Sequence, residues 1–265
     1  MSNQPRTHWN AEVYDRIGTP MRRWAQQLIA DLHLRGDETV LDAGCGSGSV
    51  TFDLLEHLPN GKIYALDSSP DMVAKLQASL DERGVRNVVA RQADLTDFAL
   101  PEPVDVVFSN AVFHWIPDDD GLFSALFRAT EPGGRLRAQC GGAGNIDRLM
   151  EATHAVQARE PYAQHLGAAS EFRKYRTPEQ VREAMERNGW RDARAQLFPS
   201  DVTFDDHDHA ALYLRTIILQ RHVNGLPEEL GERFLRNVIA ETEKRFGAPF
   251  IADYVRLDIW ATQPR

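Results

Sequence analysis

The sequence predicts an α/β fold in which a parallel sheet is covered by helices on both faces. Between Glu38 and about Cys140, short β-branched or apolar runs alternate with segments whose apolar residues recur at helical spacing. This alternation is typical of βαβ units. Turn signals agree, because Asn60-Gly61 and Pro132-Gly133-Gly134 interrupt the chain just before predicted strands, and Ser69-Pro70 is typical of a helix start.

The elements of this fold follow in order along the chain. Strands are predicted over residues 39–42, 62–66, 87–90, 104–109 and 135–139, with helices over 49–57 and 70–83. A helical segment over residues 8–34 comes first, with an apolar stripe of Met21, Trp24, Leu28, Ile29 and Leu32. Beyond residue 140 we predict a mixed helical stretch up to residue 175, a helix over 178–188 and a strand over 194–198. Two helices within 206–246, separated by a break at 224–227, and a last strand over 254–262 complete the chain.

Composition limits the classes of partner. The formal net charge of -9, from 39 acidic and 30 basic residues, disfavours nucleic acid and anionic membrane surfaces. No stretch approaches the roughly twenty apolar residues of a membrane span, and residues 1–9 lack the apolar core of a signal peptide. We therefore expect a cytoplasmic protein whose partners are small molecules or other proteins.

The chain has two cysteines, Cys45 and Cys140, which are too few for a metal cluster, and no metal site is predicted. In a doubly wound sheet the first and fifth strands flank the fourth, so the two thiols would lie about 9 to 10 Å apart. That separation exceeds bridging distance, and both thiols should be free.

A glycine-rich loop follows the first predicted strand, where Asp42 is followed by Gly44, Gly46 and Gly48. Glycines at a strand-to-helix turn let a ligand approach the backbone. The third glycine stands one position earlier than in the dinucleotide fingerprint, and the Asp42 carboxylate would repel a pyrophosphate, so a nicotinamide oxidoreductase is disfavoured. Asp42 suits a cationic group such as the ammonium of S-adenosylmethionine, although it could also cap the following turn.

Three more signals follow at the ends of later strands. Asp67, 19 positions after Gly48, is placed to accept hydrogen bonds from both ribose hydroxyls of an adenosine ligand. Asp94 could accept from an adenine amino group, with Ala93 and Leu95 packing on the ring. The segment 109–115 ends the fourth strand, in the crevice where open α/β sheets bind ligands. Asp67 and Asp94 could instead be exposed loop acids, and we favour the ligand contacts for both.

Together these motifs resemble the class I S-adenosylmethionine-dependent methyltransferases over roughly residues 35–140. More narrowly, segments 65–73, 109–117 and 159–162 look like those of trans-aconitate methyltransferases. The resemblance implies a seven-stranded sheet with a reversed last strand, and S-adenosylmethionine as cofactor with S-adenosylhomocysteine as product. It also implies a Rossmann-like methyltransferase that acts on a small molecule.

The resemblance also assigns parts of the cofactor to residues of this chain. Asp42 and the glycine loop would hold the methionine portion, Asp67 the ribose, Asp94 the adenine, and Asn110 would lie on the sulfonium side. The complete predicted cofactor site is Asp42, Gly44, Gly46, Gly48, Asp67, Ser68, Met72, Ala93, Asp94, Leu95 and Asn110.

The domain organisation follows from the same reasoning. Residues 1–265 are expected to form a single methyltransferase domain with a cofactor-binding core over residues 35–140. Residues 8–34 would form a helical lid, and segments 141–175 and 200–248 a helical cap over the acceptor site. A non-catalytic S-adenosylmethionine-binding module is the alternative from another class, and the long cap argues against it.

The acceptor side is less defined. His114, Glu171 and Tyr14 are the predicted catalytic residues, although His114 could be an aromatic wall and Glu171 a surface acid. Arg22, Arg23 or Arg173 could clamp an anionic acceptor. The resemblance to trans-aconitate methyltransferases implies O-methylation of a carboxylate, which needs no base. The alternative is methylation of carbon or a phenol, on an isoprenoid or polyketide-like acceptor, which needs a base such as His114 or Glu171.

Overall fold

A computed structural model of the chain describes residues 19–166 and 173–265. The described residues divide into two compact units. The sheet unit falls within Met21–Ala143, Phe172–Phe198 and Arg256–Arg265, and the helical unit takes the rest, chiefly residues 144–166 and 199–255. The division into one domain with a lid and a cap stays a prediction.

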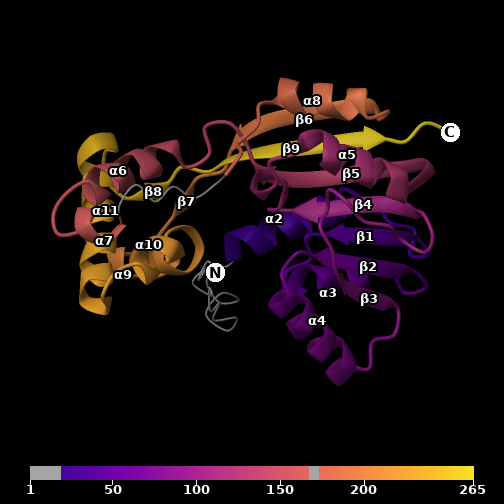
Figure 1. Cartoon of the computed structure of the whole chain (residues 1–265), viewed down its shortest axis with the longest axis horizontal. Helices are drawn as coiled ribbons and strands as arrows, with labels where there is room; N and C mark the ends of the chain where they lie inside the picture. The colour runs from indigo at the N-terminus through magenta and orange to yellow at the C-terminus, as the bar shows by residue number, and fades with distance from the viewer. Residues whose placement is uncertain (1–18, 167–172) are drawn as a thin grey trace. The chain divides into compact units, whose positions relative to one another are not determined.

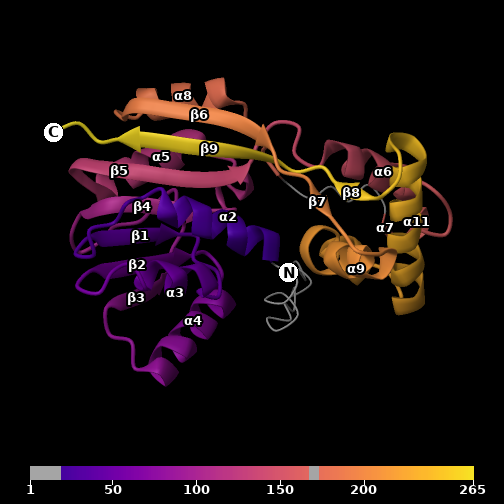
Figure 2. The ribbon, with the colours of Figure 1, turned by 180° about the vertical axis from the view of Figure 1, so that it is seen from behind.

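The sheet unit is built on a seven-stranded sheet of order β3-β2-β1-β4-β5-β9-β6, which can be followed from both sides in Figures 1 and 2. Neighbouring strands among β1 to β5 pair in parallel, and β9 runs antiparallel to β5. This confirms the predicted mostly parallel sheet with its reversed last strand. The strands are β1 (Thr39–Ala43), β2 (Lys62–Asp67), β3 (Val88–Gln92), β4 (Val104–Asn110), β5 (Thr130–Gly141), β6 (Arg191–Pro199) and β9 (Val255–Thr262).

Helices cover both faces of the sheet, as predicted. One face packs against α2 (Thr19–Ala30), α3 (Ser49–Leu55) and α4 (Pro70–Arg83), and the other against α5 (Asp119–Ala129) and α8 (Pro178–Arg187). Side chains alternate along each strand, so β4 sends Val106 and Phe108 to the first face and Val107 to the second. The first core continues with Leu28, Leu54 and Leu76, the second with Phe123, Met185 and Trp190.

Local signals explain where these helices start. Ser69 caps α4 by accepting from the backbone N–H of Met72, with Pro70 in the first turn, and α4 has the predicted bounds. Helix α5 was not predicted, although Asp118 accepts from the Gly121 N–H in the same manner. Of the predicted helix over residues 8–34, α2 covers 19–30; residues 8–18 lie outside the described residues.

The helical unit contains α6 (Asp147–Gln157), α7 (Ala163–Leu166), β7 (Val202–Thr203), α9 (His207–Tyr213), the π-helix η2 (Leu214–Ile218), α10 (Gln220–Asn224), α11 (Glu228–Phe246) and β8 (Ile251–Ala252). The predicted break at 224–227 is confirmed. The first of the two predicted helices is nevertheless divided, because the Leu219 N–H donates to the carbonyl of Leu214, five residues earlier, and widens the helix there. Among the described helices, none combines the length and apolar character that a membrane crossing requires.

Candidate functional site

The loop between β1 and α3 leaves one glycine facing open space. Gly44, Gly46 and Gly48 have φ of 88°, 54° and 95°, a region that favours glycine. A Cβ at Gly44 would lie 2.2 Å from Val112 Cγ2, and one at Gly48 would lie 2.3 Å from Leu76 Cδ1, so these two positions are closed by the protein itself. A Cβ at Gly46 would meet nothing within 4 Å. The loop therefore offers backbone at Gly46 to a ligand, which fits the predicted cofactor.

Valine at position 46 tests this fit. Gly46→Val is expected to weaken binding of S-adenosylhomocysteine at least tenfold, because a branched side chain would fill the open space above the loop. Gly84→Val is the matched control, since Gly84 ends α4 with φ of 66° and also faces open space. Both variants carry the same kind of backbone strain, so calorimetric titration separates strain from ligand contact. Equal affinity in the two variants would remove Gly46 from the site.

Asp42 is a buried acid at the end of β1. Its side chain is 2% exposed, and the Thr51 hydroxyl of α3 donates to its Oδ2 at 2.7 Å. Burial raises the pKa of the Asp42 carboxyl to about 7, with a further contribution from the charge of Asp67. The Thr51 bond ties Asp42 to the first turn of α3, but Asp42 does not cap this helix, because its N-cap is Gly48 and no side chain accepts from its first backbone N–H groups. Its contact with a ligand ammonium stays a prediction.

Asp67 joins the glycine loop to the start of α4. Its Oδ2 accepts from the Gly46 N–H and its Oδ1 from the Ser69 N–H, both at 2.9 Å. The Ala93 N–H donates to the Asp67 carbonyl at 3.0 Å, and the Gln92 side chain donates to the Ser68 carbonyl at 3.1 Å. The carboxyl ends of β1, β2 and β3 thus bring the predicted residues Gly46, Asp67, Ser68 and Ala93 together, with Met72 in the first turn of α4.

Asp94 has a local role in the turn after β3. The backbone N–H and the hydroxyl of Thr96 both donate to Asp94 Oδ1, at 2.9 and 2.8 Å. Asp94 is exposed and Leu95 is buried. The turn holds the Asp94 carboxylate at the solvent side of the loop, and its predicted contact with adenine stays a prediction.

Asn110, at the end of β4, contacts a buried arginine that sequence reasoning missed. Arg256 Nη2 donates to Asn110 Oδ1 at 3.4 Å, and Arg256 Nε donates to Gln139 Oε1 at 3.1 Å. Arg256 is 2% exposed, and its guanidinium lies 4.4 Å from the centre of the Trp24 ring. No local motif marks Arg256, because only the pairing of β9 with β5 brings it beside Asn110.

His114 lies in the short 3₁₀ helix η1 (Phe113–Trp115) and is 8% exposed. The backbone N–H of Gly141 donates to its Nδ1 at 3.3 Å. Burial holds the pKa of His114 well below its ordinary value, and the nearby guanidiniums of Arg256, Arg173 and Arg176 lower it further. The imidazole is therefore neutral, with Nδ1 as acceptor and the proton on Nε2.

The other predicted acceptor residues are placed differently. Tyr14 and Glu171 lie outside the described residues. Arg22 forms an ion pair with Asp53 of α3 at 2.8 Å, and Arg23 is exposed. Arg173 lies over the Trp115 ring at 5.0 Å.

Both cysteines are free and buried, which confirms the absence of a disulfide between them. Burial raises the pKa of the Cys140 thiol to about 11 and also raises that of Cys45. Neither thiol ionises near neutral pH, so neither acts as a nucleophile.

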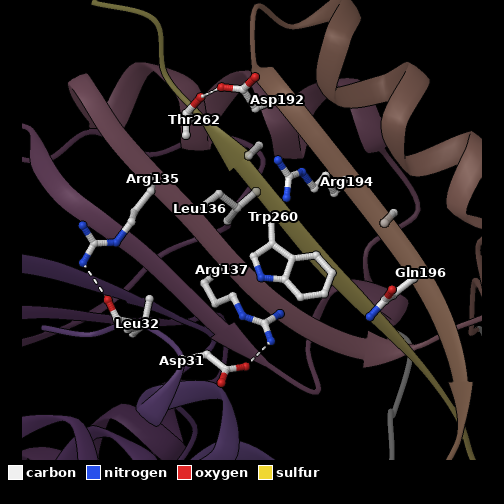
Figure 3. Close-up of a pocket in the computed structure, with 12 residues that line it drawn as sticks. Asp31, Leu32, Arg135, Leu136, Arg137, Asp192, Arg194, Gln196, Trp260 and Thr262 are labelled. Atoms are coloured by element: carbon white, nitrogen blue, oxygen red, sulfur yellow. Dashed lines mark hydrogen bonds and ion pairs between the residues drawn. The ribbon is translucent and has the colours of Figure 1, made fainter.

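A separate cleft of about 610 Å³ lies over β5, β9 and β6 (Figure 3). Arg137 and Trp260 stand at its centre, with the guanidinium 4.1 Å from the ring centre, and Arg194 rises from β6 beside them. None of the predicted cofactor residues lines this cleft. It is therefore a different place from the loop site at the carboxyl ends of the strands.

Comparison with known proteins adds family information. A family model described as a methyltransferase domain matches residues 34–205. A trans-aconitate 2-methyltransferase of Variovorax paradoxus (strain S110) is 30% identical over 253 residues, covering 89% of this chain and 88% of the relative. That of Azoarcus sp. (strain BH72) is 36% identical over 131 residues, so the match spans half the length of this relative and 49% of this chain.

Solved structures with the same fold are more distant in sequence. The YcgJ protein of Bacillus subtilis superposes with a TM-score of 0.63 at 17% identity, covering 92% of this chain and 99% of that one. A Haemonchus contortus phosphoethanolamine N-methyltransferase 2, in complex with S-adenosyl-L-methionine, superposes with a TM-score of 0.61 at 17% identity. The match covers 92% of this chain and 53% of that one. At these identities the likeness supports the fold alone.

Proposed function

Because the chain belongs to the class I S-adenosylmethionine-dependent methyltransferases, we propose that it methylates a carboxylate oxygen of a small molecule. The cofactor supplies a methyl group that is already activated on a sulfonium. Gly46, Asp67 and the turn around Asp94 would hold the cofactor, since these residues meet at the carboxyl ends of β1 to β3.

The observation that carries the proposal is the hydrogen bonding of His114. Its Nδ1 already accepts a backbone hydrogen bond, and the proton of the neutral ring is on Nε2. A group in this state donates a hydrogen bond and has no free lone pair to take a proton from an acceptor. Of the two acceptor classes, a carboxylate fits this site better than a phenol or carbon acid, because it needs no base.

Charge supports the same acceptor class. Three guanidiniums, those of Arg256, Arg173 and Arg176, are close enough to His114 to lower its pKa. Arg176 also forms an ion pair with Asp119, and basic side chains close to His114 favour an anionic ligand over a cationic one. Holding the acceptor in line with the methyl group, away from water, can contribute about 7 to 11 kcal/mol of the barrier. Relatives named trans-aconitate 2-methyltransferases make trans-aconitate the first acid to test.

Removal of His114 tests the proposal. His114→Asn keeps an acceptor for the Gly141 N–H and is expected to lower the single-turnover rate less than tenfold, below the roughly 10² to 10⁴ typical of losing a general base. The measurement is the rate against pH, with Glu171→Gln beside it, on carboxylic acids and on phenolic and isoprenoid acceptors. A carboxylate acceptor predicts ester formation and a flat profile above the acid's own pKa. A rate limb that disappears in either variant, on a phenol or carbon acceptor, would contradict the proposal.

A further inference from the structure

We propose that the cleft over β5, β9 and β6 is a second binding site, which takes a small planar carboxylic acid in its ionised form. The flat part of the ligand lies on the Trp260 indole, and its carboxylate bonds to Arg194. None of the predicted cofactor residues lines the cleft, so this inference goes beyond the proposed function and does not rest on it.

The two faces of β5, β9 and β6 carry different side chains. On the second face, Leu136 and Ile259 belong to the core that includes residues of α5 and α8. On the first face, the core takes its strand residues from β1 to β4 alone among the described strands. In the region of the cleft, the side chains that β5, β9 and β6 direct to this face are polar, with Trp260 as the exception. This part of the sheet is therefore open to a ligand instead of closed by apolar packing.

The pairing of the strands aligns the central side chains of the cleft in a row. Arg137 of β5 is opposite Trp260 of β9, and its guanidinium lies 4.1 Å from the ring centre. On the other side of β9, the Thr262 hydroxyl donates to Asp192 of β6 at 3.0 Å. Trp260 and Arg194 are each two residues away from this bonded pair, on the same face, and lie beside one another (Figure 3). The indole thus stands between one arginine from each neighbouring strand.

The two arginines differ in what they already contact. Arg137 is 4% exposed, and its Nη2 donates to Asp31 Oδ2 at 2.9 Å and to Asp258 Oδ2 at 3.3 Å. Two carboxylates therefore balance its charge, and its contact with the ring holds the indole in place. Arg194 is exposed, and no described residue forms an ion pair or hydrogen bond with its guanidinium. Arg194 is thus the cation that a ligand can use.

The groups that remain define the class of ligand. The Trp260 side chain is partly exposed and offers ring surface to a flat ligand. The Arg194 guanidinium is a planar fork of donors that matches the two oxygens of one carboxylate. Asp31 and Asp192 line the same cleft and would repel further negative charge. A planar ligand with a single carboxylate therefore fits the cleft better than a phosphate ester or a polyanion.

One enclosed donor in the wall of the cleft supports this assignment. Arg137 Nε is closed off from solvent, and none of the described residues accepts a hydrogen bond from it. Enclosed polar groups in folded proteins are nearly always paired. Because Arg137 lines the cleft, a ligand or a water molecule that enters the cleft is the group that can complete this pairing.

The tryptophans of the chain allow a local measurement. Each of the five indole N–H groups gives one signal in a proton–nitrogen correlation NMR spectrum, and Trp260→Phe identifies the Trp260 signal by its loss. The probe is benzoate, which is planar and has one carboxylate. Benzamide has the same shape without the charge, and acetate has the charge without the ring. The protein is saturated with S-adenosylhomocysteine, so that the cofactor site stays occupied.

Benzoate is expected to shift the Trp260 signal along a saturating curve. It should bind about tenfold more tightly than benzamide, the equivalent of one charged hydrogen bond, and about tenfold more tightly than acetate, the equivalent of the ring contact. Arg194→Gln removes an exposed side chain, so the fold is kept, and should weaken benzoate about tenfold without changing the Kd of benzamide. Arg191→Gln is the matched control, because it removes the same charge from the opposite face of β6 and should leave the Kd of benzoate unchanged.

Each other outcome overturns the proposal. If benzoate leaves the Trp260 signal in place, or binds only on the methyl-acceptor side, the cleft is not its site. Equal Kd values for benzoate in wild type and Arg194→Gln would remove Arg194 from the site. Benzamide or acetate binding as tightly as benzoate would show that the charge or the ring contributes nothing. Methyl transfer is not part of the measurement, so a failure of the proposed function leaves this result unaffected.

Discussion

Replacing Asp67 with alanine is expected to weaken the binding of S-adenosylhomocysteine by about 3 to 6 kcal/mol. The reason is the loss of two charged hydrogen bonds to the ribose hydroxyls, each of which contributes about 1.5 to 3 kcal/mol. The change also releases the Gly46 and Ser69 N–H groups that Asp67 now holds. The loop that presents backbone to the ligand would therefore lose its fixed position. Calorimetric titration measures the loss directly.

Two further variants control this experiment. Asp67→Asn keeps one acceptor oxygen and should give an intermediate loss, whereas Glu82→Gln, an exposed acid of α4, removes the same charge and should change affinity less than twofold. Circular dichroism checks that each variant is folded. Full affinity in folded Asp67→Ala would exclude Asp67 from the cofactor site.

The contribution of Asp42 to the stability of the ligand-free protein should fall as pH rises from about 4 to 7. An unfolded aspartate ionises near pH 3.8, whereas burial raises the pKa of Asp42 in the folded protein to about 7. Below pH 3.8 the Asp42 carboxyl is protonated in both the folded and the unfolded protein, and its contribution to stability is fully present. Between pH 3.8 and about 7 only the folded protein keeps the carboxyl protonated, so this contribution is lost as pH rises. Three pH units at 1.36 kcal/mol each give a loss of about 4 kcal/mol.

Asp42→Asn isolates this effect from other carboxyl groups. Asp119 and Glu241 have lowered pKa values in the folded protein, so their contributions change with pH in the opposite sense and are the same in both proteins. The free energy of unfolding in urea, measured from pH 4 to 8 for wild type and Asp42→Asn, gives the contribution as a difference. Parallel curves would show that Asp42 is ionised in the folded protein throughout this range.

The grouping of the residues proposed to hold the cofactor could be predicted because they are close in sequence to the strand ends that position them. Asp42, Gly46 and Asp67 each follow a recognisable strand, and the parallel order of β1 and β2 brings them together. The same local signals gave α4 its bounds. Helix α5 also has a local start signal, because Asp118 caps its first turn. This helix could therefore have been predicted from the sequence, without knowledge of its tertiary contacts.

The contacts around Asn110 and His114 could not be predicted in this way. Arg256 and Asn110 are 146 positions apart and meet only through the register of β9 on β5. The proton position on His114 depends on the Gly141 N–H, which the neighbouring strand supplies. The division of α9 and α10 depends on a single widened turn at Leu219. None of these features leaves a periodic or motif-like mark on the sequence.

The position of β9 between β5 and β6 has a consequence for biosynthesis. Strand β6 ends at Pro199, but its neighbour in the sheet begins at Val255, after most of the helical unit has been translated. At about 5 to 20 residues per second, β6 and the edge of β5 remain without their shared partner for several seconds. Unpaired edges are sites of aggregation. The nascent chain should therefore depend on chaperones most in this interval. The interval ends when β9, the strand of Arg256 and Asp258, has been translated and pairs with β5 and β6.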